Sequence, residues 1–200
     1  MMLHKMYWMM NRKEKIMSET EREIGYDINS EINVMLDLET LGTRAGCGIL
    51  SIGATTFDEK KQIHIKIPVS SSLAFGLHEE GKTLNWWYKQ DPAIREDAFS
   101  GTTQLDNALV IFYNWVQALG DSKDIYIWGN GADFDLPILG HAYSALFMEK
   151  PWAPFNGRCY RTLKSLLPHV KPGIKNAARH NALEDALYQA RHARKLLEMI

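Results

Sequence analysis

The pattern of apolar and polar positions predicts three strands early in the chain. Residues 32–40 have the apolar, partly β-branched character of a buried strand, and residues 49–57 show it again. Residues 62–69 alternate apolar with polar side chains, which predicts a third strand with one wetter face. Because short turn-rich connections separate the three segments, we expect an antiparallel meander. Gly53, inside the second strand, predicts a bulge or the close approach of another backbone.

The pattern becomes helical after the meander. Residues 70–101 are irregular and helical, and residues 104–119 form the clearest amphipathic helix, with Thr102 or Thr103 as a candidate cap. A short buried strand is then expected over residues 125–129.

Three further segments complete the predicted fold. A helix is expected over residues 136–147, a short helix over residues 160–167, and a terminal helix that ends at about residue 198. A strand, a helix and another strand in this order indicate an α/β fold, in which a mixed β-sheet is flanked by helices.

Composition adds limits to this picture. Two hundred residues with 46% hydrophobic and 24% charged content predict one soluble globular domain, residues 31–200, preceded by an N-terminal extension, residues 1–30. The net charge of −1 excludes a wholly basic nucleic-acid binder. Cys47 and Cys159 lack zinc-site spacing, so we expect a reduced, cytoplasmic chain. No apolar run approaches the length of a membrane span.

Asp37 and Glu39 lie two residues apart at the end of the first predicted strand. Alternate side chains of an extended chain share a face, so both carboxylates project the same way. A cation between them would relieve their repulsion, and paired hard oxygen ligands suit Mg²⁺ or Mn²⁺. Two surface acids at a strand end are the alternative, so the interpretation depends on whether other carboxylates and a general base converge on this pair.

A second acidic pair, Asp133 and Asp135, follows the strand over residues 125–129. Because both precede a predicted helix, each is a candidate for capping that helix or favouring its positive end. Asp135 is the stronger candidate metal ligand. For Asp133, a purely structural role at the start of the helix and a role at the site are equal alternatives.

His180 and Asp185 lie at the start of the terminal helix. Inside one helix they would point about 140° apart, so we expect the histidine before the helix, on a mobile loop from which it reaches the same site. A surface histidine and a first-turn acid are the simpler alternative.

Aromatic and basic residues complete the candidate chemistry. Trp86 and Trp87 are adjacent and cannot both face one core from a helix, so one is expected to be partly exposed, either towards a partner or as a platform for stacking nucleobases. Between residues 158 and 197, nine lysines and arginines oppose two acids. This polarity fits a phosphate-tracking face, and a solvated helix surface accounts for part of it.

Three motifs in order resemble those of the DEDDh exonucleases, a ribonuclease H-like (DnaQ-like) superfamily. They are Asp37-Leu-Glu39-Thr40, Gly131-Ala-Asp-Phe-Asp135 and His180-x-Ala-x-x-Asp185. Features resembling Leu84-Asn-Trp-Trp87, Trp128-Gly-Asn-Gly131 and Tyr160-Arg-Thr-Leu163 place the chain nearest to a branch with the phage exonuclease DexA and a mycobacterial exoribonuclease-like family. The family aspartate follows the phenylalanine of the second motif, which selects Asp135.

The resemblance implies a 3′-5′ exonuclease that releases 5′-mononucleotides from single-stranded DNA or RNA with a free 3′ end. It implies two Mg²⁺ or Mn²⁺ ions, with Asp37, Glu39, Asp135 and Asp185 as ligands and His180 as general base. The residues expected to bind substrate are Thr40, Leu41 as an apolar wedge, Trp86, Trp87 and Arg161. It also favours a homodimer, by analogy with RNase T.

The phage-type resemblance places DNA slightly ahead of RNA as the expected substrate. An exoribonuclease is the nearest alternative, and an inactive nucleic-acid-binding module of the same fold is the alternative from another class. The four carboxylates and the histidine argue against the inactive module. A nucleotide-cofactor enzyme is disfavoured because no glycine-rich phosphate motif follows a strand.

Overall fold

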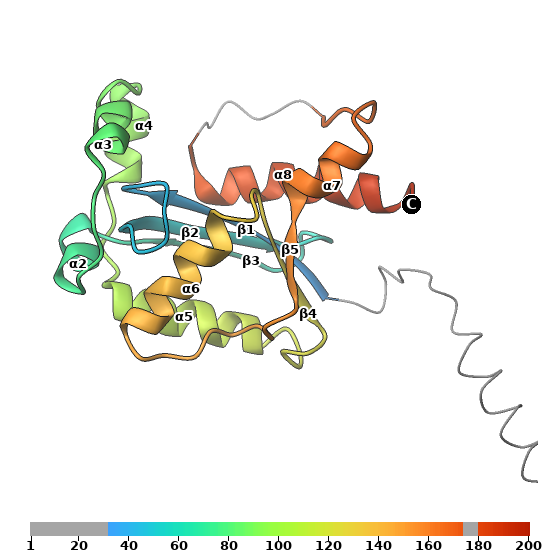
Figure 1. Ribbon diagram of the computed structural model, residues 1–200, viewed down its shortest axis with the longest axis horizontal. Helices are drawn as coiled ribbons and strands as arrows, with labels where there is room; N and C mark the ends of the chain where they lie inside the picture. Colours follow the sequence, from blue (N-terminus) through green and yellow to red (C-terminus); the bar gives the residue numbers. More distant parts are fainter. Residues whose placement is uncertain (1–31, 174–179) are drawn as a thin grey trace, which may run out of the picture. The chain divides into compact units, whose positions relative to one another are not determined.

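A five-stranded mixed sheet forms the centre of the computed structural model, which describes residues 32–173 and 180–200 (Figure 1). The strand order is β3-β2-β1-β4-β5. The strands are β1 (Ile32–Thr40), β2 (Ile49–Thr56), β3 (Gln62–Lys66), β4 (Ile125–Gly129) and β5 (Gly157–Cys159). Strands β1, β2 and β3 pair antiparallel, and β4 and β5 run parallel to β1. The predicted meander and mixed sheet are confirmed, whereas β5 is too short for its pattern to have predicted it.

Helices cover both faces of this sheet. Helices α5 (Leu105–Gln117) and α6 (Asp135–Ala145) pack on one face, and α7 (Tyr160–Leu166) and α8 (Ala182–Leu197) pack on the other (Figure 1). Three short helices, α2 (Val69–Ala74), α3 (Gly81–Tyr88) and α4 (Pro92–Ala98), occupy the region predicted to be irregular.

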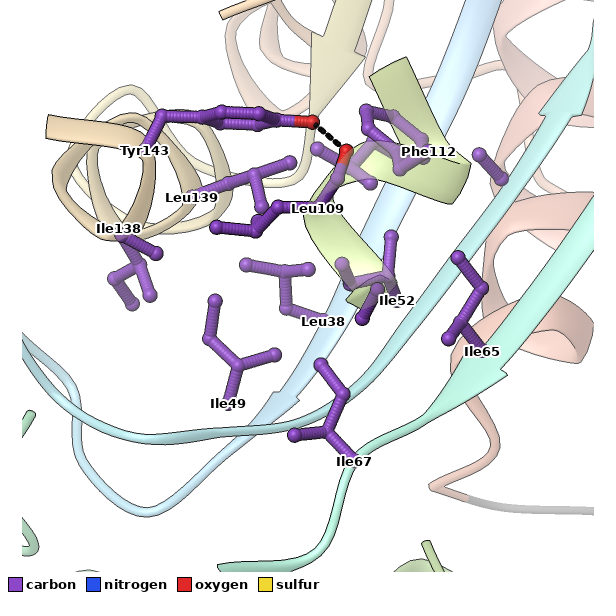
Figure 2. Close-up of a cluster of buried hydrophobic side chains, with 14 of the residues drawn as sticks. Leu38, Ile49, Ile52, Ile65, Ile67, Leu109, Phe112, Ile138, Leu139 and Tyr143 are labelled. Carbon is purple, nitrogen blue, oxygen red and sulfur yellow. Dashed lines mark hydrogen bonds between the residues drawn. The ribbon is translucent and has the colours of Figure 1, made fainter. Parts of the chain in front are cut away.

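The larger core lies between the sheet and helices α5 and α6. Inward-facing isoleucines and leucines of β1, β2 and β3 meet Leu109 and Phe112 of α5 and Ile138 and Leu139 of α6 (Figure 2). The hydroxyl of Tyr143 donates a 2.8 Å hydrogen bond to the carbonyl of Leu109 and joins the two helices. The predicted amphipathic helix is therefore confirmed.

Small residues on α8 bring this helix close to the other face of the sheet. Ala186, Ala190 and Ala193 are fully buried beside Met35 and Trp128. At the start of α8 the approach is closest, because a Cβ on Gly53 would lie 2.2 Å from the backbone of Ala182 and Leu183. The predicted close approach at Gly53 is confirmed, and it fixes where α8 begins relative to β2.

Two local predictions were wrong. Neither Thr102 nor Thr103 caps α5, because its N-cap is Gln104 and Ser71 Oγ accepts a 2.7 Å hydrogen bond from the N–H of Leu105. The third strand ends at Lys66, and helix α2 begins at Val69. At the start of α5, a partner from a distant segment replaces the local capping signal.

The predicted N-terminal extension lies outside the described residues. Within residues 32–173 and 180–200, no helix is both long and apolar enough to cross a bilayer.

Candidate active site

Asp37 and Glu39 are among the last residues of β1. They lie at the edge of the sheet where the parallel strands β1 and β4 end. Both side chains line the same cavity, as their two-residue spacing predicts. Gln189 Nε2 donates a 2.7 Å hydrogen bond to Asp37 Oδ1. The two carboxylates are therefore held at the edge where β4 also ends.

Asp135 opens α6 directly beyond the end of β4. Its carboxylate is almost fully buried and accepts two backbone hydrogen bonds, from the N–H of Leu38 at 3.2 Å and from that of Asn130 at 2.7 Å. Gly129 leaves room for it, since a Cβ there would lie 3.0 Å from Asp135 Oδ2. Asp133, in contrast, is exposed and does not line the cavity.

The start of α8 places Asp185 at the same edge. Asn181 is the N-cap and its Oδ1 accepts a 3.2 Å hydrogen bond from the N–H of Glu184. Asp185 and Gln189 are four residues apart and therefore lie on one face of the helix, which points towards Asp37. Both side chains are buried.

His180 lies immediately before α8, as predicted, with a backbone φ of 58°. Ligand atoms of Glu39, His180 and Asp185 all lie within 4.8 Å of one another. The imidazole contacts Trp86 edge to face, with 4.7 Å between the ring centroids. The mobility expected for the loop that carries His180 stays a prediction, because residues 174–179 lie outside the described residues.

A cavity of about 510 Å³ opens over these groups. Among the residues predicted from sequence, seven line it: Asp37, Glu39, Thr40, Trp86, Trp87, His180 and Asp185. Trp86 is 41% exposed and Trp87 is 2% exposed, so the expectation of one partly exposed tryptophan is confirmed. Asp135 is buried close to Asp37 and does not itself line the cavity.

Leu41 does not face the cavity. Its side chain is fully buried with Leu50, Trp87 and Ala98, so it is not placed to act as an apolar wedge against a nucleotide. The β1–β2 pairing shifts register between Glu39 and Thr40, and such an irregularity interrupts the alternation of side chains. Thr40 consequently lines the cavity and Leu41 turns into the core.

Burial and mutual repulsion oppose ionisation of the carboxylates. The pKa of Asp37 is raised well above its usual value by burial and by the neighbouring carboxylates of Asp135, Glu39 and Asp185, while the bond from Gln189 lowers it. Burial raises the pKa of Asp135 to about 6, against the effect of its two backbone donors. The hard oxygen donors of these carboxylates fit Mg²⁺ or Mn²⁺.

The predicted basic tract is divided between several surfaces. Arg161 donates a 2.7 Å hydrogen bond to the carbonyl of Asn130 and lies close enough to Asp135 to lower its pKa slightly. Arg191 is paired with Glu59 at 2.7 Å, away from the carboxylates. Only part of the tract is therefore available to the candidate site.

Several residues at the site were not predicted from the sequence. Gln189 contacts Asp37 directly, and its spacing of four residues from Asp185 was the available signal. Glu80, Lys82 and Thr83, at the start of α3, form the cavity wall. Their position depends on how α3 packs against β1, which no local pattern specifies.

Comparisons with known proteins identify the family and the fold of this chain. Residues 32–197 match the family model of the 3′-5′ exoribonuclease Rv2179c-like domain. No curated protein matches the chain. Among solved structures, the nuclease domain of 3′hExo, a DEDDh family member bound to rAMP, aligns with a TM-score of 0.59 and 12% identity over 86% of this chain and 94% of that one.

Two further structures show the same fold. A 3′-exonuclease that recognises the 3′ end of the histone mRNA stem-loop aligns with a TM-score of 0.59 and 12% identity, over 98% of this chain and 73% of that one. Cell-death related nuclease 4 (CRN-4) aligns with a TM-score of 0.53 and 13% identity, over 84% of this chain and 64% of that one. These likenesses confirm the predicted ribonuclease H-like fold.

The family match covers nearly all of the chain beyond residue 31 and includes the three acidic motifs. The narrower expectation of the phage DexA branch stays a prediction. The chain belongs to the 3′-5′ exoribonuclease Rv2179c-like family, and it is a 3′-5′ exonuclease.

Proposed function

We propose that the enzyme degrades single-stranded nucleic acid from a free 3′ end, releases 5′-mononucleotides, and uses two divalent cations with His180 as general base. The observation that carries this proposal is the convergence of Glu39, His180 and Asp185 within 4.8 Å in a cavity that Asp37 also lines. Asp37, Glu39, Asp135 and Asp185 are the proposed ligands of Mg²⁺ or Mn²⁺.

The donor set supports this assignment. Buried carboxylates that raise one another's pKa are stabilised by bound cations, and each oxygen of Asp135 keeps a second lone pair beside its backbone hydrogen bond. When bound, two divalent ions supply Lewis-acid stabilisation of the negative charge that grows on the entering and leaving oxygens.

The chain's own residues position the substrate and accept the proton. An imidazole has an unperturbed pKa near neutrality, so His180 is suited to accept a proton from the attacking water at physiological pH. The backbone donors of Leu38 and Asn130 hold Asp135, and Gln189 holds Asp37, so the ligand oxygens keep fixed directions. Thr40 lies at the cavity wall, where a terminal nucleotide would contact it.

RNA is the proposed preferred polymer. The family is described by its exoribonuclease activity, which places RNA ahead of the DNA expected from the phage-type resemblance. Thr43, Glu80 and Thr83 add hydroxyl and carboxylate groups to the cavity, and groups of this kind form hydrogen bonds with a 2′-hydroxyl. Arg161 beside Asn130 is a proposed contact for the substrate backbone.

Digestion of matched oligonucleotides tests this function. RNA and DNA that are 3′-blocked, 5′-blocked or unblocked are incubated with Mg²⁺, Mn²⁺ or EDTA, and released mononucleotides are quantified. We expect metal-dependent release that only the 3′ block prevents, with faster release from RNA. Internal cleavage, or full activity in EDTA, would contradict the proposal.

The His180→Ala variant tests the general base. We expect the variant to bind Mn²⁺ and RNA as the wild type does and to lose about 10²- to 10⁴-fold in turnover. Unchanged turnover would remove His180 from the mechanism. If folded wild-type protein binds RNA without digesting it, the chain is an inactive binding module instead.

We also propose an oligomeric state and a cellular location for the enzyme. The enzyme is proposed to act as a homodimer in the cytoplasm, with Cys47 and Cys159 as free thiols. Light scattering on the eluted protein measures the oligomeric state, and a monomeric mass at all concentrations would reject the dimer.

A further inference from the structure

The indole of Trp86 contacts the imidazole of His180 edge to face. The ring centroids are 4.7 Å apart and the planes cross at 88°. Trp87 lies farther away, at 6.2 Å, with an angle of 78°. Resting on the proposed role of His180 as general base, we infer that Trp86 is a positioning residue that holds the imidazole in its productive orientation over the carboxylates.

The backbone of His180 is fixed while its ring depends on neighbours. A φ of 58° is uncommon for residues other than glycine, and it persists only where the surrounding structure determines it. On the following side, Asn181 caps α8, and α8 begins where it contacts Gly53. The aromatic contact with Trp86 restrains the side-chain torsions that orient the ring.

Trp86 itself belongs to a rigid unit. The neighbouring Trp87 is buried, and its Nε1 donates a 2.9 Å hydrogen bond to the carbonyl of Thr40. Phe99 packs edge to face on Trp87 at 5.7 Å. Because Thr40 directly follows Glu39, the contact with Trp86 positions the imidazole relative to Glu39, whose ligand atom lies within 4.8 Å of the histidine.

Base stacking is the competing role for Trp86, since its side chain is 41% exposed and lines the cavity. The two roles predict different kinetics. A positioning residue acts on the chemical step, so its removal lowers kcat and leaves KM unchanged. A stacking platform binds substrate, so its removal raises KM.

Two variants of Trp86 separate these roles in steady-state digestion of single-stranded RNA with Mg²⁺. We expect Trp86→Leu to lower kcat by about 10- to 10²-fold with KM unchanged, since small misplacements of a catalytic group have effects of this size. Trp86→Phe keeps an aromatic ring and should restore most of the rate. Tyr88→Leu is the matched control, because Tyr88 lies on the same helix, is 77% exposed and does not line the cavity.

A double-mutant cycle tests whether Trp86 acts through His180. If it does, Trp86→Leu has no further effect on kcat in a His180→Ala background. Equal losses in both backgrounds, or a raised KM with unchanged kcat, would overturn the inference and favour stacking. Wild-type turnover of His180→Ala would instead refute the proposed function, so the two failures are distinguishable.

A spectroscopic measurement gives a readout that does not depend on turnover. In metal-free protein, we expect Trp86→Leu to shift the imidazole C–H resonances of His180, assigned by comparison with His180→Ala, because the ring current of the indole is lost. Tyr88→Leu should leave them in place. Unshifted resonances in a folded Trp86→Leu protein would show that the two rings are not in contact.

Discussion

The carboxylate cluster should make the metal-free enzyme less stable as the pH rises. Burial, followed by the charges of Asp135, Glu39 and Asp185, raises the pKa of Asp37 well above its usual value. Burial likewise raises the pKa of Asp135 from 3.8 to about 6. Each group is therefore harder to ionise in the folded chain than in the unfolded chain, and folding favours the protonated forms.

The raised pKa of Asp135 sets the magnitude of this effect. A rise from 3.8 to about 6 corresponds to about 3 kcal/mol of unfolding free energy, at about 1.4 kcal/mol for each tenfold change in proton affinity. This stabilisation is fully present below pH 3.8 and is lost as the pH rises through about 6. Roughly half of the loss falls between about pH 5 and pH 8. Ionisation of Asp37 changes stability in the same direction.

Urea denaturation in EDTA at a series of pH values measures this effect. The wild type is compared with Asp135→Asn, whose side chain cannot ionise. This substitution also alters the hydrogen bonds from the backbone N–H groups of Leu38 and Asn130, and that change affects the free energy of unfolding equally at every pH. We expect the wild type to lose about 1–2 kcal/mol more than the variant between about pH 5 and pH 8. Asp133→Asn, at an exposed position, is the matched control and should follow the wild type.

Added Mg²⁺ or Mn²⁺ should reverse the loss at high pH. A cation present at 100 times its dissociation constant stabilises the folded state by about 2.7 kcal/mol. Asp135→Asn should gain less, because one ligand has lost its charge. The reasoning would be refuted if the wild type and Asp135→Asn had equal pH dependence in EDTA, or if neither cation stabilised the wild type at about pH 8.

Three further substitutions test the supports of the site. Gly53→Ala should lower stability by about 1–3 kcal/mol and turnover by about 10-fold or more, because a Cβ there displaces the start of α8. Urea denaturation measures the stability and RNA digestion measures the turnover. Wild-type values for both would contradict the close contact. Gln189→Leu removes the donor to Asp37 and should weaken Mn²⁺ binding about tenfold in a calorimetric titration, with unchanged affinity as the contrary result. Tyr143→Phe should cost about 1 kcal/mol by losing the bond to Leu109, and activity should persist; reduced turnover at full stability would show an unsuspected link to the site.

Regular periodicity explains why most of the fold was predictable. The strand alternation of β1 places Asp37 and Glu39 on one face, and the amphipathic pattern identified α5 to within two residues of its ends. A parallel β4 then brings the start of α6 to the same edge, so the convergence of Asp135 with the first pair follows from chain order. Most predictions based on a repeating pattern were therefore reliable, although the alternation over residues 62–69 carried the third strand beyond its end at Lys66.

Other errors occur where a repeating pattern is interrupted or a resemblance is carried over. The family resemblance predicted that Leu41 contacts a nucleotide, whereas after the register shift between Glu39 and Thr40 its side chain is buried in the core. The cap of α5 was assigned to neighbouring threonines, whereas Ser71 from a distant segment accepts the hydrogen bond. A single irregular residue or a distant partner leaves no periodic signal in the sequence.

Gly53 shows how far a local signal extends. A glycine inside a buried strand predicts that another backbone comes close, and the structure identifies that backbone as the start of α8. The same contact fixes the helix that carries Asp185 and Gln189 and is preceded by His180. The sequence therefore indicated that the position of Gly53 was constrained. Only the tertiary structure shows that this constraint, acting through α8, helps to place the proposed ligand Asp185, its neighbour Gln189 and the proposed base His180 at one edge of the sheet.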